Sequence, residues 1–290
     1  MRIGFIGAGI VGTALAVRLS EHGYSIVAVA DLRFEAAEKL AGGIQGCDVQ
    51  ADNRGVAEHS DLVFITTSDE NIGSVAAGLH LRAGQNAVHC SGAASLDILH
   101  PAWEAGTDVG SFHPLQTFAS AEQALSNLPG STFAIEAEGE LFETLKEMAE
   151  ALGGRWIKLT PENKPLYHAA AVFAGNYPVT LMNVAVTLWE QMGFSKKEAQ
   201  EALLPLMRGA LNNLASGDLA ESLTGPIARG DLGTIKSHLE NLRDKAPDFL
   251  HIYCCLGLAT IPIALAKGSI SETRADEIRR LLEMQQRNSK

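Results

Sequence analysis

The sequence predicts an α/β fold in which a doubly wound, mainly parallel sheet is followed by an all-α C-terminal region. Three observations favour it. A glycine-rich turn follows the first apolar segment, strand-like and helical segments alternate up to Thr160, and helical periodicity dominates from Glu162 onward. With 290 residues, the chain is long enough for two domains.

The first predicted strand, residues 2–6, runs into the turn Gly7-x-Gly9-x-x-Gly12, and a helix should begin near Val11. In such a turn the first glycine permits the tight bend, the second lets bare backbone approach a pyrophosphate, and the third lets helix and strand pack closely. The helix N-terminus then favours the phosphate charge. A secretory signal is the alternative, but four glycines interrupt its would-be apolar segment.

A second apolar run, residues 24–30, ends at Asp31, 19 residues after Gly12. This spacing completes the Rossmann dinucleotide fingerprint, in which an acid accepts the ribose 2′-hydroxyl. A carboxylate there repels a 2′-phosphate and slightly favours NAD, whereas Arg33 keeps NADP open. The residues expected to hold the cofactor are Gly7, Ala8, Gly9, Ile10, Val11, Gly12, Asp31, Arg33, Thr67, Ser68, Ser91 and Gly92.

Further strands are predicted at residues 25–30, 61–67, 86–90, 108–111, 132–136 and 156–159. Long helices are predicted at residues 165–192, 195–216, 232–245, 248–267 and 271–287. Gly193, Gly268 and Ser271 are expected to stop or cap helices. The domain boundary should lie near residues 159–163, so that residues 1–160 form the cofactor domain and residues 161–290 a helical domain for substrate binding and dimerisation.

Composition excludes several classes of partner. The formal net charge of −11 argues against nucleic acid, since phosphate binding needs a surplus of lysine and arginine. The four cysteines form no CxxC pair, which indicates reduced thiols in a cytoplasmic protein and no metal site. The apolar residues 249–266 carry His251, Thr260 and Pro262, and therefore indicate a core helix better than a membrane span.

The loops after the strands carry the first candidate site residues, because ligands bind beyond the carboxyl ends of strands in such sheets. Thr67 and Ser68 follow one strand, and Ser91 and Gly92 follow the next. Ser91 is expected to bind cofactor and substrate, with a loop-stabilising turn as the alternative. His113, before a proline, is expected to bind substrate or to serve as a structural hydrogen-bonding histidine.

The helix that begins near Lys164 carries the candidate catalytic residues. At 100° per residue, His168, Asn176 and Asn183 fall in one sector of a mostly apolar helix. His168 would donate or accept a proton, Asn176 would hold the carbonyl, and Asn183 would contact substrate. A purely structural network between helices remains the alternative.

A loop at residues 223–231 contains Arg229, whose guanidinium could clamp a substrate carboxylate or pair with the protein's own acids. Asp231 is expected to cap the following helix.

Four stretches carry a resemblance that covers nearly the whole chain: SGA at 91–93, FHPLQTF at 112–118, YHAAAVFAGNY at 167–177 and LTGPIARGD at 223–231. They resemble a bacterial family of Rossmann-like proteins with an uncharacterised C-terminal helical domain. Its architecture is similar to that of 6-phosphogluconate dehydrogenase, the β-hydroxyacid dehydrogenases, pyrroline-5-carboxylate reductase and ketopantoate reductase. The resemblance implies an NAD(P)-dependent enzyme that dimerises through its helices, with ketopantoate as a candidate substrate.

One position departs from those relatives. In the hydroxyacid dehydrogenases and ketopantoate reductase, a catalytic lysine precedes an active-site asparagine by one helical turn. If Asn176 is that asparagine, the lysine position holds Val172. The proton donor would then be His168, Lys164 or water.

The sequence therefore predicts an NAD(P)-dependent oxidoreductase that transfers a hydride between the nicotinamide and a small oxo acid or related carbonyl. Two alternatives stay open. One is a non-catalytic redox sensor, in which His168 and Asn176 would pack against protein. The other is an imine reductase of the pyrroline-5-carboxylate type, which needs no strong general acid.

Overall fold

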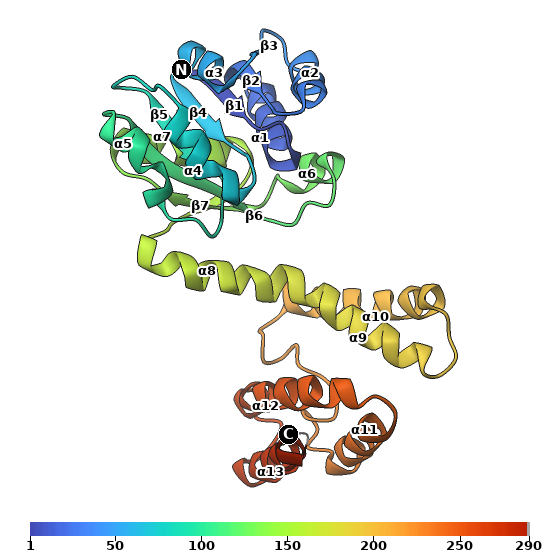
Figure 1. Ribbon diagram of the computed structural model, residues 1–290. Coiled ribbons are helices and arrows are strands. Elements are labelled where there is room, and N and C mark those ends of the chain that lie inside the picture. The colour runs from blue at the N-terminus through green and yellow to red at the C-terminus, as the bar shows by residue number, and fades with distance from the viewer. Residues whose placement is uncertain (289–290) are drawn as a thin grey trace. The chain divides into compact units, whose positions relative to one another are not determined.

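The computed structural model describes residues 1–288 and divides the chain into two compact units, one ending at Asn176 and the other beginning at Tyr177. The first unit is built on one eight-stranded sheet (Figure 1). Its strands are β1 (Arg2–Ile6), β2 (Ser25–Ala30), β3 (Asp48–Val49), β4 (Leu62–Ile65), β5 (Asn86–His89), β6 (Asp108–Leu115), β7 (Thr132–Glu136) and β8 (Arg155–Lys158).

The strand order is β3-β2-β1-β4-β5-β6-β7-β8, and every neighbouring pair is parallel except β6 with β7. This is the predicted doubly wound, mainly parallel sheet, with the chain reversing direction between β3 and β4 across the central β1. The predicted bounds of β1, β2 and β7 match the structure. The prediction missed β3, and it ended β6 four residues early, at Ser111.

Helices cover both faces of the sheet. Those of the first unit are α1 (Ile10–Glu21), α2 (Phe34–Gly42), α3 (Asn53–His59), α4 (Asp69–Gly78), α5 (His100–Glu104), α6 (Ala121–Asn127), α7 (Gly139–Ala151) and α8 (Lys164–Ala171). Buried residues of α1, α2, α6 and α7 pack on one face, and those of α3, α4 and α5 on the other. The strands are therefore apolar on both sides, which explains their unbroken apolar runs.

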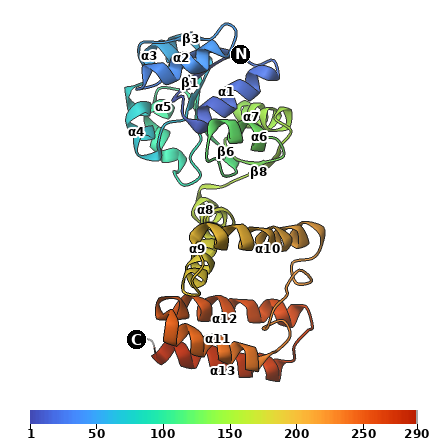
Figure 2. The ribbon, with the colours of Figure 1, turned by 90° about the vertical axis from the view of Figure 1, so that its right-hand side faces the viewer.

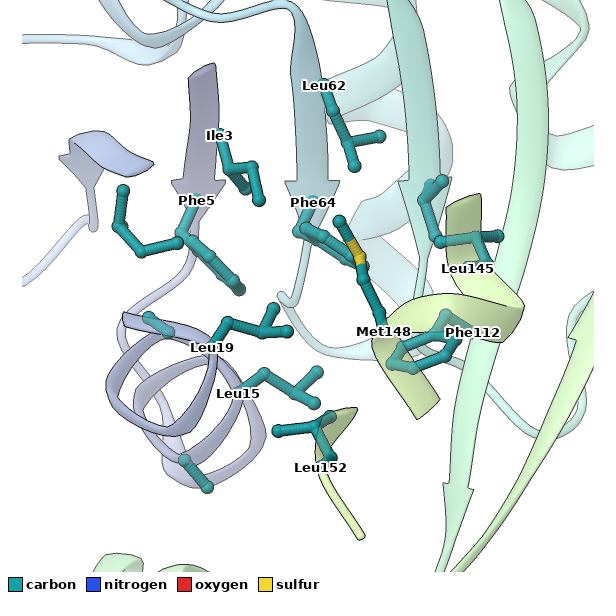
Figure 3. Packing of buried hydrophobic residues seen from close by; sticks show 14 of the residues in the cluster. Ile3, Phe5, Leu15, Leu19, Leu62, Phe64, Phe112, Leu145, Met148 and Leu152 are labelled. Carbon is teal, nitrogen blue, oxygen red and sulfur yellow. The ribbon is translucent and has the colours of Figure 1, made fainter. Parts of the chain in front are cut away.

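Aromatic rings occupy the centre of the first face. Phe5 stacks on Phe64 with ring centroids 5.1 Å apart, and Phe112 stacks on Phe133 at 4.6 Å. Figure 3 shows Phe5, Phe64 and Phe112 beside leucines of α1 and Met148 of α7. Burial of each such ring contributes about 1.5–3 kcal/mol. This packing fixes the central strands and hence the loops that follow them.

The second unit is all-helical, as predicted, with α9 (Tyr177–Glu190), α10 (Lys196–Ser216), α11 (Leu232–Lys245), α12 (Leu250–Ala266) and α13 (Glu272–Asn288). Figure 2 shows these helices from a second side. The predicted residues that stop or cap helices are confirmed. Gly193 and Gly268 adopt positive φ after α9 and α12, the Asp231 carboxylate accepts the Thr234 N–H, and Ser271 accepts the Arg274 N–H.

The predicted helix at residues 165–192 is interrupted. α8 passes into a π-helical turn at Val172–Asn176 before α9 begins. The sheet ends at Lys158, so secondary structure changes where expected, but the compact units divide only at the end of the π turn. The domain boundary at residue 160 stays a prediction.

The four cysteines, all within the described residues, form no disulfide bond. Cys47 and Cys254 are buried, Cys90 is partly buried, and Cys255 on α12 is exposed. Two helical stretches, Pro161–Glu190 and Pro247–Ala266, are long and apolar enough to cross a membrane by length and composition alone. A core helix of a soluble protein passes the same test, and α12 contributes Leu250, Cys254 and Ile261 to the core of the second unit.

Candidate active site

The glycine turn has the geometry that the sequence predicts. Gly7 has φ of +107°, and a Cβ there would lie 2.8 Å from the Thr66 backbone. A Cβ on Gly12 would lie 2.2 Å from the Gly7 carbonyl oxygen, so the helix could not approach the strand with any larger residue. Around Gly9, by contrast, no atom lies within 4 Å of the added Cβ. The turn therefore leaves open space at the one glycine that should face a ligand.

The N-terminus of α1 fits a pyrophosphate. Gly9 is its N-cap and has no side chain to accept the first N–H groups, and the first turn contains no acidic residue. These N–H groups have no partner within the helix and point outward with the positive end of its dipole. The residues present thus match the anionic part of a dinucleotide.

A cavity of about 570 Å³ opens beside this turn. Among the predicted cofactor residues, Gly7, Gly9, Asp31, Arg33, Thr67 and Ser68 line it. Sequence reasoning missed Asn53, Thr66, Asn71 and Ser74, which line it as well. Ala8 and Ile10 line a smaller adjoining cavity of about 290 Å³, together with Gly9, Arg33 and Lys39.

The Asp31 carboxylate accepts hydrogen bonds from the protein's own backbone. Its Oδ2 accepts the Ala8 N–H at 2.7 Å and its Oδ1 accepts the Arg33 N–H at 2.8 Å. The carboxylate is 12% exposed, whereas the Arg33 side chain is 74% exposed. Asp31 therefore braces the glycine turn, and the argument that its charge favours NAD is weakened.

The loop after β5 brings two histidines together. The Ser91 hydroxyl accepts the N–H groups of Ala93 and Ala94 at 3.1 and 3.0 Å, which is the loop-stabilising turn considered as its alternative role. A Cβ on Gly92 would lie 2.8 Å from the His113 ring and 3.1 Å from Nδ1 of His168. Glycine at position 92 thus lets both imidazoles converge. The ligand-binding roles of Ser91 and Gly92 stay predictions.

A second cavity of about 690 Å³ lies in the same unit. It is lined by His113, Leu115, Gln116, Thr117, Tyr167, His168, Ala170, Ala171, Ala174, Gly175 and Asn176. The predicted residues His113, His168 and Asn176 therefore share one open cavity. The π-helical turn supplies its last three residues, which is typical of π turns near functional sites.

A short hydrogen bond in this cavity joins His113 and Tyr167. The Tyr167 hydroxyl lies 2.6 Å from His113 Nδ1, and the rings meet edge to face with centroids 5.7 Å apart. Sequence reasoning did not single out Tyr167, because an aromatic residue on a mostly apolar helix indicates packing. The signals for it were its place beside His168 and its position at the start of the YHAAAVFAGNY stretch.

Burial favours the neutral form of His113 in this cavity and of His89 on the neighbouring strand β5. Burial, with smaller effects from the charges of His168 and Lys164, lowers the pKa of His113 to about 4, while Asp69 opposes the shift. Burial, helped by Lys164 and His113, lowers the pKa of His89 to about 3. Burial also raises the pKa of Tyr167 to about 12. At neutral pH the Tyr167–His113 pair therefore consists of a phenol and a neutral imidazole.

His168 differs from His113 in its partners. Among the described residues, no atom forms a hydrogen bond to its buried Nδ1. Such an atom is costly to leave unpaired, so this nitrogen is suited to a ligand or water. Asn176, which also lines the cavity, is exposed.

Three further candidates fall elsewhere. Asn183 and Arg229 are exposed residues of the second unit, and their substrate contacts stay predictions. Lys164 is 1% exposed, and its Nζ donates to Ser111 and Glu136. It therefore has no free path to a substrate as a proton donor. Among the described residues, no group of three or more metal-ligating side chains occurs.

Comparison with solved structures places the fold. A Bacteroides fragilis protein assigned to the NADP oxidoreductases is 26% identical, with 89% of this chain and 96% of that chain covered and a TM-score of 0.69. An Aspergillus terreus reductive aminase in complex with NADPH and ethyl-5-oxohexanoate is 16% identical (99% and 94% covered, TM-score 0.60). A Coxiella burnetii pyrroline-5-carboxylate reductase is also 16% identical (95% and 97% covered, TM-score 0.59). At 16% identity, the likeness concerns the fold alone.

The sequence comparisons match separate parts of the chain. A curated relative, inositol 2-dehydrogenase 4 of Saccharopolyspora erythraea, is 44% identical over 64 residues, and the match spans only 19% of its length. Residues 2–91 match the family described as NADP oxidoreductase, coenzyme F420-dependent, and residues 131–260 match the domain of unknown function DUF2520. The chain thus combines a match to an NADP oxidoreductase Rossmann domain with a match to a DUF2520 domain.

Proposed function

We propose that the protein is an NADPH-dependent reductase of a small carbonyl compound. The observation that carries this proposal is the Tyr167 hydroxyl, 2.6 Å from His113 Nδ1, in a cavity that His168 and Asn176 also line. Reduction of a carbonyl requires a proton for its oxygen, and this pair can supply one. When bound, the cofactor supplies the hydride.

The preference for NADPH over NADH rests on two basic side chains. Arg33 and Lys39 line the cavity beside Gly9, and Arg33 is mostly exposed. A guanidinium near the end of the second strand is the usual partner of a 2′-phosphate. The matched family and the Bacteroides fragilis protein are both described as NADP oxidoreductases, which also supports NADP. The slight preference for NAD inferred from Asp31 is not supported.

Proton transfer would proceed through Tyr167. Its hydroxyl proton passes to the developing alkoxide, and the Nδ1 proton of His113 passes to the resulting phenolate. The Nε2 of His113 takes up a proton from solvent at the same time, so the imidazole stays neutral overall. His168 and Asn176 would orient the carbonyl by hydrogen bonds.

For the substrate, we propose a small oxo acid, with a ketopantoate-like compound as the candidate. Gln116, Thr117 and Asn176 line the cavity and offer neutral donors for a carboxylate. The experiment is a panel of oxo acids, ketones and cyclic imines assayed with NADPH and with NADH. Turnover of oxo acids that depends on Tyr167 supports the proposal, and tight NADPH binding with no compound reduced contradicts it.

Imine reduction is the second candidate, and one observation favours it. Of the described residues that line the 690 Å³ cavity, none is lysine or arginine. An anionic substrate would find no opposite charge there, whereas an iminium would meet only neutral groups. An imine arrives protonated, so Tyr167→Phe should leave its reduction largely intact but lower ketone reduction by about 10²- to 10⁴-fold.

A redox sensor without turnover would bind cofactor while His168 and Asn176 packed against protein. Both residues instead line an open cavity, which favours an enzyme. The substrate panel separates the two, because a sensor would bind NADPH and reduce nothing.

We further propose a cytoplasmic homodimer formed through the helical domain, with no nucleic-acid or membrane partner. Val179 of α9 and Leu206 and Leu211 of α10 are 71%, 72% and 57% exposed. Exposed apolar side chains at such density are typical of subunit interfaces. Light scattering after size exclusion should give twice the chain mass, and L206E–L211E should give the monomer.

A further inference from the structure

A row of polar side chains crosses three strands in the interior of the first unit. His89 of β5 pairs in register with Ser111 of β6, and Ser111 pairs with Glu136 of β7. Residues in one row project from the same face of a sheet. The three residues are 0%, 1% and 3% exposed, so the row is buried.

Lys164 reaches this row from the first turn of α8. Its Nζ donates a hydrogen bond to Ser111 Oγ at 3.0 Å and forms an ion pair with Glu136 Oε2 at 2.8 Å. It is the one buried residue of α8. A buried ion pair, rather than an apolar side chain, therefore anchors the start of this helix on the sheet.

Stability alone gives a poor account of this arrangement. Burying two charges costs solvation energy that their attraction only partly restores, and apolar residues of similar volume often do as well. The polar row to which the pair belongs is also incompletely satisfied. Among the described residues, neither Glu136 Oε1 nor His89 Nε2 has a hydrogen-bond partner. Groups that break a rule of packing in this way are commonly retained for function.

The location of the pair indicates which function. Tyr167 and His168 follow Lys164 by about one helical turn, and His113 follows Ser111 by two residues on β6. The same two elements, α8 and β6, therefore carry the ion-pair network and, one step further along, the Tyr167–His113 hydrogen bond. A shift of α8 along β6 would disturb both together.

We propose that Lys164 is a positioning residue of the active site. Its ion pair with Glu136, made beside Ser111, sets the position of α8 against β6. This position keeps Tyr167 in contact with His113 and keeps His168 beside Gly92. The role as positioning residue of a reductase rests on the proposed function, whereas the effect on the histidines does not. In support, burial and the charge of Lys164 both lower the pKa of His89 and of His113. The other titratable groups that face His113 are His168, Tyr167 and Asp69.

The test compares K164M with the charge-free double variant K164M–E136L. The matched control is K158M, which removes the exposed lysine of β8 that pairs with Glu138. We expect K164M to lower kcat by about 10²-fold, the usual cost of misplacing a reacting group by an ångström, with NADPH affinity unchanged. The double variant should recover the thermal stability that K164M loses without recovering kcat. If kcat recovers together with stability, or if K164M keeps full kcat, the proposal is wrong.

A second readout does not depend on knowing the reaction. NMR titration of the His113 ring should give a higher pKa in K164M and in the double variant than in the wild type and K158M. If the wild type reduces no compound in the panel, the proposed function fails, and this titration alone decides the effect of Lys164 on the histidines. An unchanged His113 titration in both variants would overturn the proposed effect of Lys164 on the histidines.

Discussion

The Tyr167 hydroxyl and His113 Nδ1 lie 2.6 Å apart, although the two residues come from a helix and a strand separated by 54 positions in the chain. A Tyr–His pair also occurs in the second unit, where the Tyr253 hydroxyl lies 2.9 Å from His238 Nδ1. Tyr253 therefore serves as an internal control for Tyr167, because it forms a similar pair with a histidine but does not line the 690 Å³ cavity.

Tyr167→Phe should remove that donor while preserving the ring. We expect kcat/KM for a ketone substrate to fall by about 10²- to 10⁴-fold, and NADPH binding to remain as in the wild type. Steady-state kinetics and calorimetric titration measure the two quantities. Tyr253→Phe is the matched control and should keep full activity. Equal activity of Y167F and the wild type would exclude Tyr167 as the donor.

Gly92→Ala should separate the two imidazoles. The new Cβ would lie 2.8 Å from the His113 ring and 3.1 Å from His168 Nδ1, distances at which one of the rings must move. We expect kcat to fall by about 10²-fold, as for other small displacements of reacting groups. Gly42→Ala is the control, because no atom lies within 4 Å of its added Cβ. Unchanged kcat in G92A would mean that the imidazoles need not meet there.

Arg33→Ala combined with Lys39→Ala should weaken NADPH binding selectively. Each hydrogen bond from a charged group contributes about 1.5–3 kcal/mol, so Kd for NADPH should rise by at least about 10- to 100-fold. Kd for NADH should change little, since NADH has no 2′-phosphate. The exposed pair Arg208 and Lys236, replaced by alanine, controls for the loss of charge. A parallel loss of both cofactors would place Arg33 elsewhere on the nucleotide.

Acid should destabilise the fold through His89. Its pKa is about 3 in the folded protein against an ordinary value of 6.5, so between these pH values the unfolded chain binds more protons. The free energy of unfolding then falls as pH falls through this window, by about 1.4 kcal/mol per pH unit while only this group titrates. His89→Gln should flatten the fall in Tm between pH 6.5 and 4, and exposed His80→Gln should not. An identical pH dependence in H89Q and the wild type would count against this assignment.

Much of the fold was predictable because its signals are local. The apolar run before Gly7 and the spacing from Gly12 to Asp31 identify the first two strands and the turn between them. Helix ends were found where a single residue determines them, as at Gly193 and Asp231. β3 was missed because two residues, Asp48 and Val49, are too few to establish a period.

The site was predictable only in part, because its contacts are not local. His113, His168 and Asn176 were found by their polarity in apolar surroundings, and one cavity joins them. The partner of Lys164 could not be found, since Glu136 meets it only through the order of strands in the sheet. The sector assigned to Asn176 and Asn183 assumed 100° per residue, and the π-helical turn at Val172–Asn176 departs from that value.

The distribution of thiols has a practical consequence. Cys255 is the one exposed cysteine, while burial raises the pKa of both Cys47 and Cys90 and so disfavours their reactive thiolates. A maleimide dye should therefore label the native protein at a single site on α12. Fluorescence from that dye would report on the helical region without any engineered mutation.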